Sequence, residues 1–247
     1  MGNFNIKKMK LVHGILTLVF PVLLFSQNKI IIPKGGMIVF QSKEIITDKG
    51  LYVNSMKEFK KEMLSGIEEE VVLERLTSGI KTDSVQLKEI VGLMEENLSS
   101  FFEIKNNVQY RHEFKGNIIN NSHSFEGEVY EENTIDIRAG MNMEYYSYNE
   151  IFDLREFKNE TKKINGYDCF KVTYSYKEES GLDFNDFLSG YINHRELWVT
   201  EKIKCVYHPV INDRQILEKY YPLDISERSD AIKGCEIKYS LVSIEIN

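Results

Sequence analysis

The sequence of 247 residues contains few of the residue types that build linkers, disulfide frameworks or nucleic-acid-binding tails. Its four prolines and 15 glycines are too few for a linker-rich or collagen-like chain. No block of five like charges occurs, and a net charge of −7 disfavours nucleic acid as a partner, because neutralising phosphates requires clustered Lys and Arg. A hydrophobic content of 42% with 28% charged residues is typical of a folded globular domain.

The sequence also lacks the motifs that usually indicate catalysis or metal binding. It has five histidines, but it contains no HExxH pair, no Cys/His cluster, no G-x-S-x-G and no phosphate-binding loop. Asp183-x-Asn185 begins like a calcium loop, but Phe187 occupies the place of the third ligand. We therefore expect no metal, no cofactor and no enzymatic activity, and a hydrolase is the least favoured function.

Three cysteines are present, Cys169, Cys205 and Cys235. An odd number leaves at least one thiol unpaired within a chain, and spacing does not choose among the three possible bridges. Each cysteine lies in an apolar, strand-like segment, which also suits a buried thiol that packs as a small hydrophobic side chain. The sequence leaves their disulfide state open.

The longest apolar run lies near the N-terminus. Three lysines precede an apolar stretch over 11–25, and the small residue Ser26 follows. This arrangement is typical of a secretory signal peptide, so we assign one to 1–26 and expect a single exported domain over 27–247. No other run is long enough to span a bilayer, so the processed chain is not expected to cross a membrane.

Two amphipathic helices are predicted in the first half of the chain. Ser55 and Glu58 have the spacing of a capping box, and apolar residues then recur every three or four positions. We assign this helix to 55–78 and a second one, with the same periodicity, to 83–98. Each helix has an apolar face that needs a partner surface.

From about residue 101 the apolar period changes from 3.6 to 2, which is typical of strands with one buried face. The clearest alternation covers 108–115, 169–177, 197–207 and 235–246, and shorter candidates lie at 37–46, 125–138, 141–148 and 151–157. The last long segment changes phase near Leu241, as a β-bulge would require.

These elements predict an α+β fold. Its centre is a curved antiparallel β-meander over about 101–247, an incomplete barrel of about 8–10 strands. The two amphipathic helices are predicted to cover the concave face of this sheet, because their apolar faces need such a surface.

Two segments resemble a known family. Lys163-Ile-Asn-Gly-Tyr-Asp-Cys169 and Glu196-Leu-Trp-Val-Thr-Glu201 are similar to a strand entry and a tryptophan-bearing strand of the GLPGLI group of secreted proteins, which resemble the LolA/LolB-type half-barrels. The Gly-Leu-Pro-Gly-Leu-Ile run itself is absent, and 220–224 is the segment nearest to it. The resemblance implies a protein of the Gram-negative envelope, periplasmic or secreted, whose concave apolar face holds lipid or acyl chains.

The predicted ligand-binding residues lie on the apolar side of the alternating strands, since residues of one parity share a face. They are Tyr110, Phe114, Phe170, Tyr174, Leu197 and Val199. Phe184, Phe187 and Leu188 recur at roughly helical spacing between two strands, which suits either a lid over the half-barrel or an inert insertion.

Two functions remain open on these residues. The favoured one is a binding protein that holds a lipid or acyl chain in the half-barrel. The alternative is an envelope protein with a filled core that works through its surface, as a partner of an outer-membrane complex. In a filled core Tyr174→Ala destabilises the fold strongly, whereas in a ligand cavity it mainly reduces lipid retention.

Overall fold

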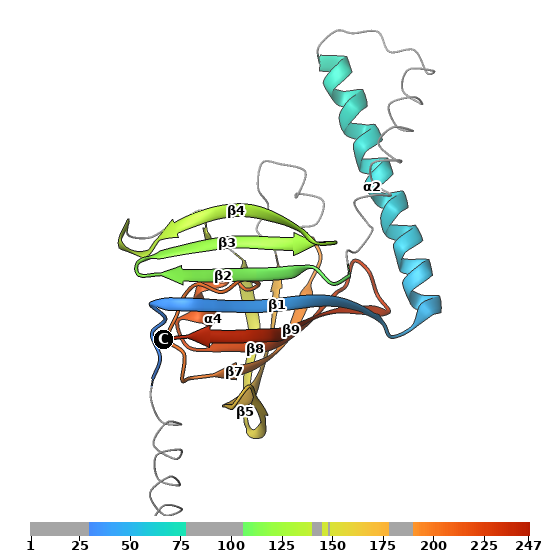
Figure 1. The fold of residues 1–247 in the computed structure, drawn as a ribbon. Helices are drawn as coiled ribbons and strands as arrows, with labels where there is room; N and C mark the ends of the chain where they lie inside the picture. The colour runs from blue at the N-terminus through green and yellow to red at the C-terminus, as the bar shows by residue number, and fades with distance from the viewer. Residues whose placement is uncertain (1–29, 78–105, 140–144, 148, 178–189) are drawn as a thin grey trace, which may run out of the picture.

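The computed structural model describes residues 30–77, 106–139, 145–147, 149–177 and 190–247. These residues form one antiparallel sheet of nine strands and two α-helices (Figure 1). In chain order the elements are β1 (Gly35–Ile46), α2 (Lys49–Thr77), β2 (Gln109–Lys115), β3 (Ile118–Phe125), β4 (Glu128–Asp136), β5 (Glu150–Ile164), β6 (Tyr167–Lys177), β7 (Asn193–Thr200), α4 (Arg214–Leu217), β8 (Tyr221–Ser229) and β9 (Cys235–Ile246).

The sheet is open, with strand order β4-β3-β2-β1-β9-β8-β7-β6-β5. The edge strands β4 and β5 do not pair with each other, and β1 pairs with β9 in the interior of the sheet. The predicted antiparallel meander is therefore confirmed as an open sheet. Within the described part of the chain, no helix is long and apolar enough to cross a membrane.

The predicted change of phase near Leu241 is a β-bulge. Val39 pairs with Ser243 while Phe40 pairs with Leu241, so Val242 has no partner in β1. Asn165 and Gly166 form the turn that joins β5 to β6, with φ of 45° and 85°. Positive φ at both positions is what a type I′ hairpin turn requires.

Some strand boundaries differ from the prediction. The segment 125–138 crosses a turn, since Glu126 and Gly127 have φ of 52° and 87° and separate β3 from β4. The segment 197–207 is also too long, because β7 ends at Thr200 and the chain then leaves the sheet. Strand β3 was not predicted, because its sequence is mostly polar. Strand β8 was not predicted either.

The predicted start of the first helix is wrong. Helix α2 begins at Lys49, and Asp48 caps it by accepting the N–H of Leu51 on Oδ1 at 2.9 Å. Ser55 lies inside the helix, where its hydroxyl accepts the N–H of Lys233 at 3.0 Å and lies 3.0 Å from the carbonyl oxygen of the same residue. Ser55 therefore joins α2 to the turn between β8 and β9.

The covering of the concave face by helices is not confirmed. Helix α2 runs away from the sheet beyond its first turns (Figure 1). The second predicted helix, 83–98, lies outside the described residues. So do the predicted signal peptide, 1–26, and the possible lid residues Phe184, Phe187 and Leu188.

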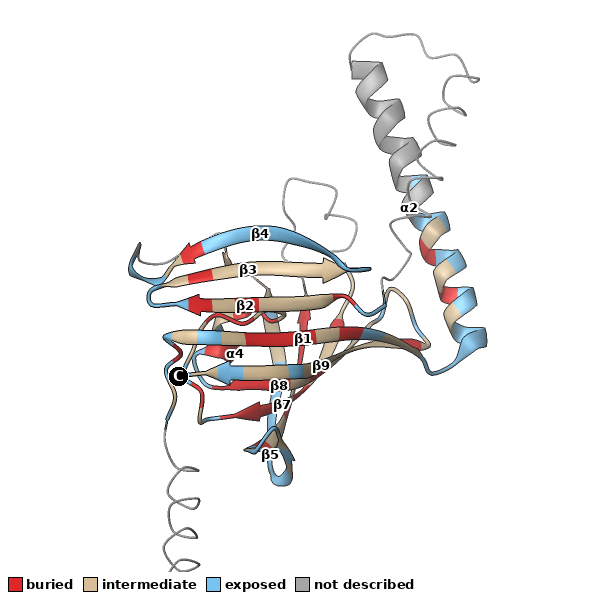
Figure 2. Cartoon of the chain, in the orientation of Figure 1, coloured by how far each residue is buried: buried red, intermediate tan, exposed pale blue. Residues whose placement is uncertain are grey.

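The segment 201–220, between β7 and β8, covers much of the concave, inner face of the sheet. Its apolar residues belong to the same buried core as Phe40 of β1 and Leu197 of β7; they are Ile203, Tyr207, Ile211, Ile216, Leu217 and Tyr220. Buried positions accordingly gather on β1, β7, β8 and α4 (Figure 2). Each such side chain contributes about 1.5–3 kcal/mol of burial free energy, so this segment is an integral part of the fold.

Candidate functional site

The cross-strand register places all six predicted ligand-binding residues on the inner face. Phe170 pairs with Val199, and Tyr110 pairs with Phe40 of the core. Phe114, Tyr174, Leu197 and Val199 are buried, whereas Tyr110 and Phe170 are half-buried. The inner face therefore has a filled part and a more open part.

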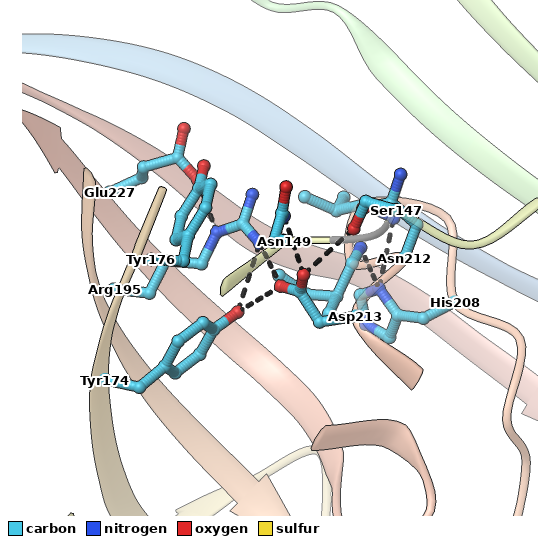
Figure 3. Close-up of polar contacts among 11 residues, drawn as sticks. Ser147, Asn149, Tyr174, Tyr176, Arg195, His208, Asn212, Asp213 and Glu227 are labelled. Carbon is cyan, nitrogen blue, oxygen red and sulfur yellow. Dashed lines mark hydrogen bonds and ion pairs between the residues drawn. The ribbon is translucent and has the colours of Figure 1, made fainter. Parts of the chain in front are cut away.

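In the filled part, Tyr174 belongs to a buried polar network (Figure 3). Its hydroxyl donates to Asp213 Oδ2 at 2.6 Å, and Arg195 Nη1 donates to the same oxygen at 2.5 Å. The other oxygen, Oδ1, accepts from Ser147 Oγ at 3.0 Å and from Asn149 Nδ2 at 2.8 Å. Asp213 is 1% exposed, so these donors replace the water that its charge would otherwise require.

Arg195 connects this network to β8. Its Nε donates to Glu227, whose Oε2 also accepts the Tyr176 hydroxyl at 3.2 Å. The guanidinium carbon lies 4.4 Å from the centroid of the Tyr176 ring. Burial lowers the pKa of Arg195, but the neighbouring carboxylates outweigh burial and hold it well above its usual range. Arg195 therefore stays charged between two carboxylates.

The geometry of this network suits a structural clamp. Both oxygens of Asp213 are occupied by donors from the protein itself. Burial raises the pKa of Tyr174 well above its usual range, so its hydroxyl remains a donor at neutral pH. The contacts of Asp213 hold the segment 201–220 against β6 and β7.

His208 forms a second clamp in the same segment. Its Nδ1 accepts the N–H groups of Val210 and Ile211, each at 3.0 Å, so the ring proton lies on Nε2, which is 3.0 Å from the carbonyl oxygen of Pro222. The Tyr145 hydroxyl accepts the N–H of His208 at 2.7 Å and donates to its carbonyl oxygen at 2.5 Å. Burial lowers the pKa of His208 to about 3, which keeps the ring neutral.

His112 has the opposite surroundings. It has no exposed surface, and neither ring nitrogen has a hydrogen-bond partner among the described residues. Its ring lies among the rings of Phe114 and Tyr145, at centroid distances of 6.3 and 6.2 Å. Burial lowers the pKa of His112 to about 3, and the side chain of Asn121 opposes this only in part. His112 is thus a neutral core residue.

The open part of the inner face lies over β2, β3 and β4. Tyr110, His123 and Tyr130, which we call the aromatic row, follow one another across these strands. The ring of Tyr110 lies 6.5 Å from that of His123, and His123 stacks on Tyr130 at 5.1 Å with an interplanar angle of 16°. Tyr130 is 45% exposed, so the row keeps part of its ring surface accessible.

Carboxylates flank the aromatic row. Glu132 Oε1 lies 2.8 Å from His123 Nδ1, and its Oε2 accepts Asn121 Nδ2 at 2.5 Å. The Tyr130 hydroxyl donates to Glu128 at 2.6 Å. Burial and, after it, the charge of Glu132 raise the pKa of Tyr110. His123 and Tyr130 were not among the predicted residues. Gly127 was a signal for the turn that pairs them, but the glutamate before it is unusual at positive φ.

Other candidate chemistry is weak in the described residues. Cys169, Cys205 and Cys235 are unbridged, and burial raises the pKa of Cys169 and Cys205 to about 12 and about 11. These thiols are therefore poor nucleophiles. The same part of the chain contains no group of three or more His, Cys, Asp or Glu side chains arranged to hold a metal ion.

Comparisons with known proteins give one weak likeness. No protein-family model and no curated protein matches the sequence, so the resemblance to the GLPGLI group is unsupported. Among solved structures, the lipoprotein LppX of Mycobacterium tuberculosis is similar with a TM-score of 0.24 and 11% identity. The likeness covers 57% of this chain and 67% of that one. A likeness of this size shows neither a family nor a function.

Proposed function

We propose that this chain is an exported, non-enzymatic binding protein that holds a lipid or acyl chain on the open part of its inner face. The observation that carries the proposal is that the inner face is divided into a covered part and an open part. The segment 201–220 covers one part and is clamped there by Asp213 and His208, while the aromatic row over β2–β4 keeps exposed ring surface. Exposed apolar surface in a soluble domain commonly marks a binding site.

Most of the six ligand-binding residues predicted from the sequence lie outside the proposed site. Tyr174, Leu197 and Val199 pack against the protein's own chain in the filled part. Phe170 packs edge-on against Tyr220 with centroids 5.7 Å apart. Of the predicted set, Tyr110 is the residue that belongs to the aromatic row.

Lipid retention tests the proposal. We expect lipid to co-purify with the protein in detergent-free buffer and to be detected by native mass spectrometry. Tyr130→Ser should reduce the bound fraction, whereas Val129→Ser should not. Val129 is the matched control because it is 59% exposed on the same strand, and its parity places it on the opposite face. Equal loss in both variants would contradict the proposed site.

Export is part of the same proposal and has its own test. Three lysines followed by the apolar stretch over 11–25 support it. We expect N-terminal sequencing of protein from the envelope fraction to begin near Gln27. An envelope protein that still begins at Met1 would contradict signal cleavage.

The edge strand β4 favours a second candidate, the interaction module. Among the described residues, one side of β4 has no partner strand, and the first seven residues of β4 are exposed. Such an edge can accept a strand from another protein through backbone hydrogen bonds. If the purified protein carries no lipid, an envelope partner that pairs with β4 becomes the better proposal.

A further inference from the structure

Among the described residues, the Asp, Glu, Lys and Arg side chains at the inward positions around the aromatic row are all acidic. Glu128, Tyr130 and Glu132 come from β4. Glu132 contacts Asn121 and His123 of β3, Tyr130 stacks on His123, and Glu128 accepts the Tyr130 hydroxyl. Ile38 pairs with His112, and His112 pairs with Asn121, so residues of the same parity on each strand point to the inner face. None of these inward positions on β1–β4 is a lysine or an arginine. Among the described residues, neither Glu128 nor Glu132 is paired with a lysine or arginine.

Aromatic rings beside carboxylates that have no lysine or arginine partner among the described residues are a chemically specific combination. The face of an aromatic ring attracts a cation within about 6 Å of its centroid. A carboxylate beside that ring adds a Coulomb attraction and disfavours an anionic ligand. The stacked rings of His123 and Tyr130, with Glu128 and Glu132 on either side along β4, provide both features.

We propose that the aromatic row binds its ligand through an alkylammonium group, held over the rings of Tyr110, His123 and Tyr130 and neutralised by Glu128 and Glu132. The inference rests on the proposed function, because it names the head group of the ligand that the open part of the inner face would take. A phosphate or sulfate head group is disfavoured at the same place. The ammonium can come from a lipid head group or from a small free molecule.

Calorimetric titration with single-chain amphiphiles tests the head group. The probes are dodecyltrimethylammonium, dodecyl maltoside and dodecyl sulfate, which share one tail, each below its micelle-forming concentration. We expect the ammonium probe to bind about tenfold more tightly than the neutral one, and the sulfate to bind least. Tetramethylammonium, which has no tail, separates the two sources of the ammonium group.

Matched variants separate a defined site from general attraction to an acidic protein. Glu132→Gln should weaken binding of the ammonium probe about fivefold and leave dodecyl maltoside binding unchanged. Glu131→Gln is the control: it removes the same charge one residue away, but Glu131 pairs with Ser122, whose parity is that of the outer face. It should leave the affinity for the ammonium probe unchanged.

The outcomes distinguish failure of this inference from failure of the proposed function. If all three amphiphiles bind equally, or if Glu131→Gln weakens binding as much as Glu132→Gln, the ammonium site is wrong although apolar binding stands. If tetramethylammonium binds as tightly as its dodecyl analogue, the ammonium site is right and the apolar function is wrong. If none of the probes binds, both are wrong.

Discussion

At the scale of single residues, the buried polar side chains of the inner face fall into two groups. Asp213 and His208 are fully paired, and their partners belong to both the sheet and the covering segment. His112 is as deeply buried, yet both of its ring nitrogens lack partners among the described residues. The first group therefore stabilises the fold, whereas the second costs free energy that the surrounding apolar contacts must offset.

The Tyr174 hydroxyl gives a direct test of the clamp. Tyr174→Phe removes one donor from the buried Asp213 carboxylate and should lower the free energy of unfolding by about 1.5–3 kcal/mol. Tyr174→Ala also leaves a cavity and should cost about 3–5 kcal/mol. Urea denaturation measures both. Tyr130→Phe, which removes a hydroxyl from a residue that is 45% exposed, should cost less than about 0.5 kcal/mol. Equal costs for the two Tyr→Phe variants would disprove the clamp.

The two buried histidines predict how stability depends on pH. Burial holds the pKa of His112 and of His208 at about 3, while an unfolded histidine has a pKa near 6.5. Between these values the unfolded state binds a proton at each site and the folded state does not, so stability falls as the pH falls. Each histidine should cost about 2 kcal/mol between pH 7.5 and pH 5, as measured by urea midpoints.

His112→Phe provides the control for this dependence. It removes a titrating group that has no hydrogen bond to lose among the described residues. About half of the loss between pH 7.5 and pH 5 should disappear, with no loss of stability at pH 7.5. An unchanged pH dependence would mean that His112 is protonated in the folded state.

At the scale of elements, the least predictable features are those fixed by distant contacts. Helix α2 was predicted from its periodicity, but its start was misplaced because Asp48, not Ser55, accepts the capping N–H. The segment 201–220 was read in part as strand, since Ile203, Cys205 and Tyr207 alternate. The position of this segment depends on contacts with residues that are not adjacent in sequence, such as the one between His208 and the carbonyl oxygen of Pro222. The parity of β2, β6 and β7 was readable because alternation fixes the face locally.

Three substitutions in α2 distinguish the two descriptions of its start. Asp48→Ala should cost about 1 kcal/mol, the usual value for a lost helix cap. Ser55→Ala should cost about 1–3 kcal/mol, because it deprives the backbone of Lys233 of its partner. Glu58→Ala should change stability by less than about 0.5 kcal/mol, because Glu58 is an exposed residue inside the helix. A cost for Glu58→Ala similar to that for Ser55→Ala would restore the capping box. Thermal denaturation measures all three.

At the scale of the whole molecule, the fold class could be predicted from the sequence, but the segment that covers the concave face could not. Alternation over several strands indicates an open antiparallel sheet, and the structure confirms this. Which part of the chain fills the concave face depends on contacts far apart in sequence, such as the one between Tyr174 and Asp213. The candidate site was predicted only at Tyr110, because His123 and Tyr130 lie on strands whose separating turn has an unusual glutamate at positive φ.

The pairing of β1 with β9 makes the molecule a candidate for circular permutation. The N–H of Lys34 donates to the carbonyl oxygen of Asn247 at 2.8 Å, so a short peptide linker can join the two ends of this sheet. Opening the chain between Glu126 and Gly127 places the new termini in an edge turn and leaves every strand pair intact. The permuted protein should unfold cooperatively in urea and keep the far-ultraviolet circular dichroism of the parent. Opening it instead within 206–212, where His208 holds the cover in place, should abolish the cooperative transition.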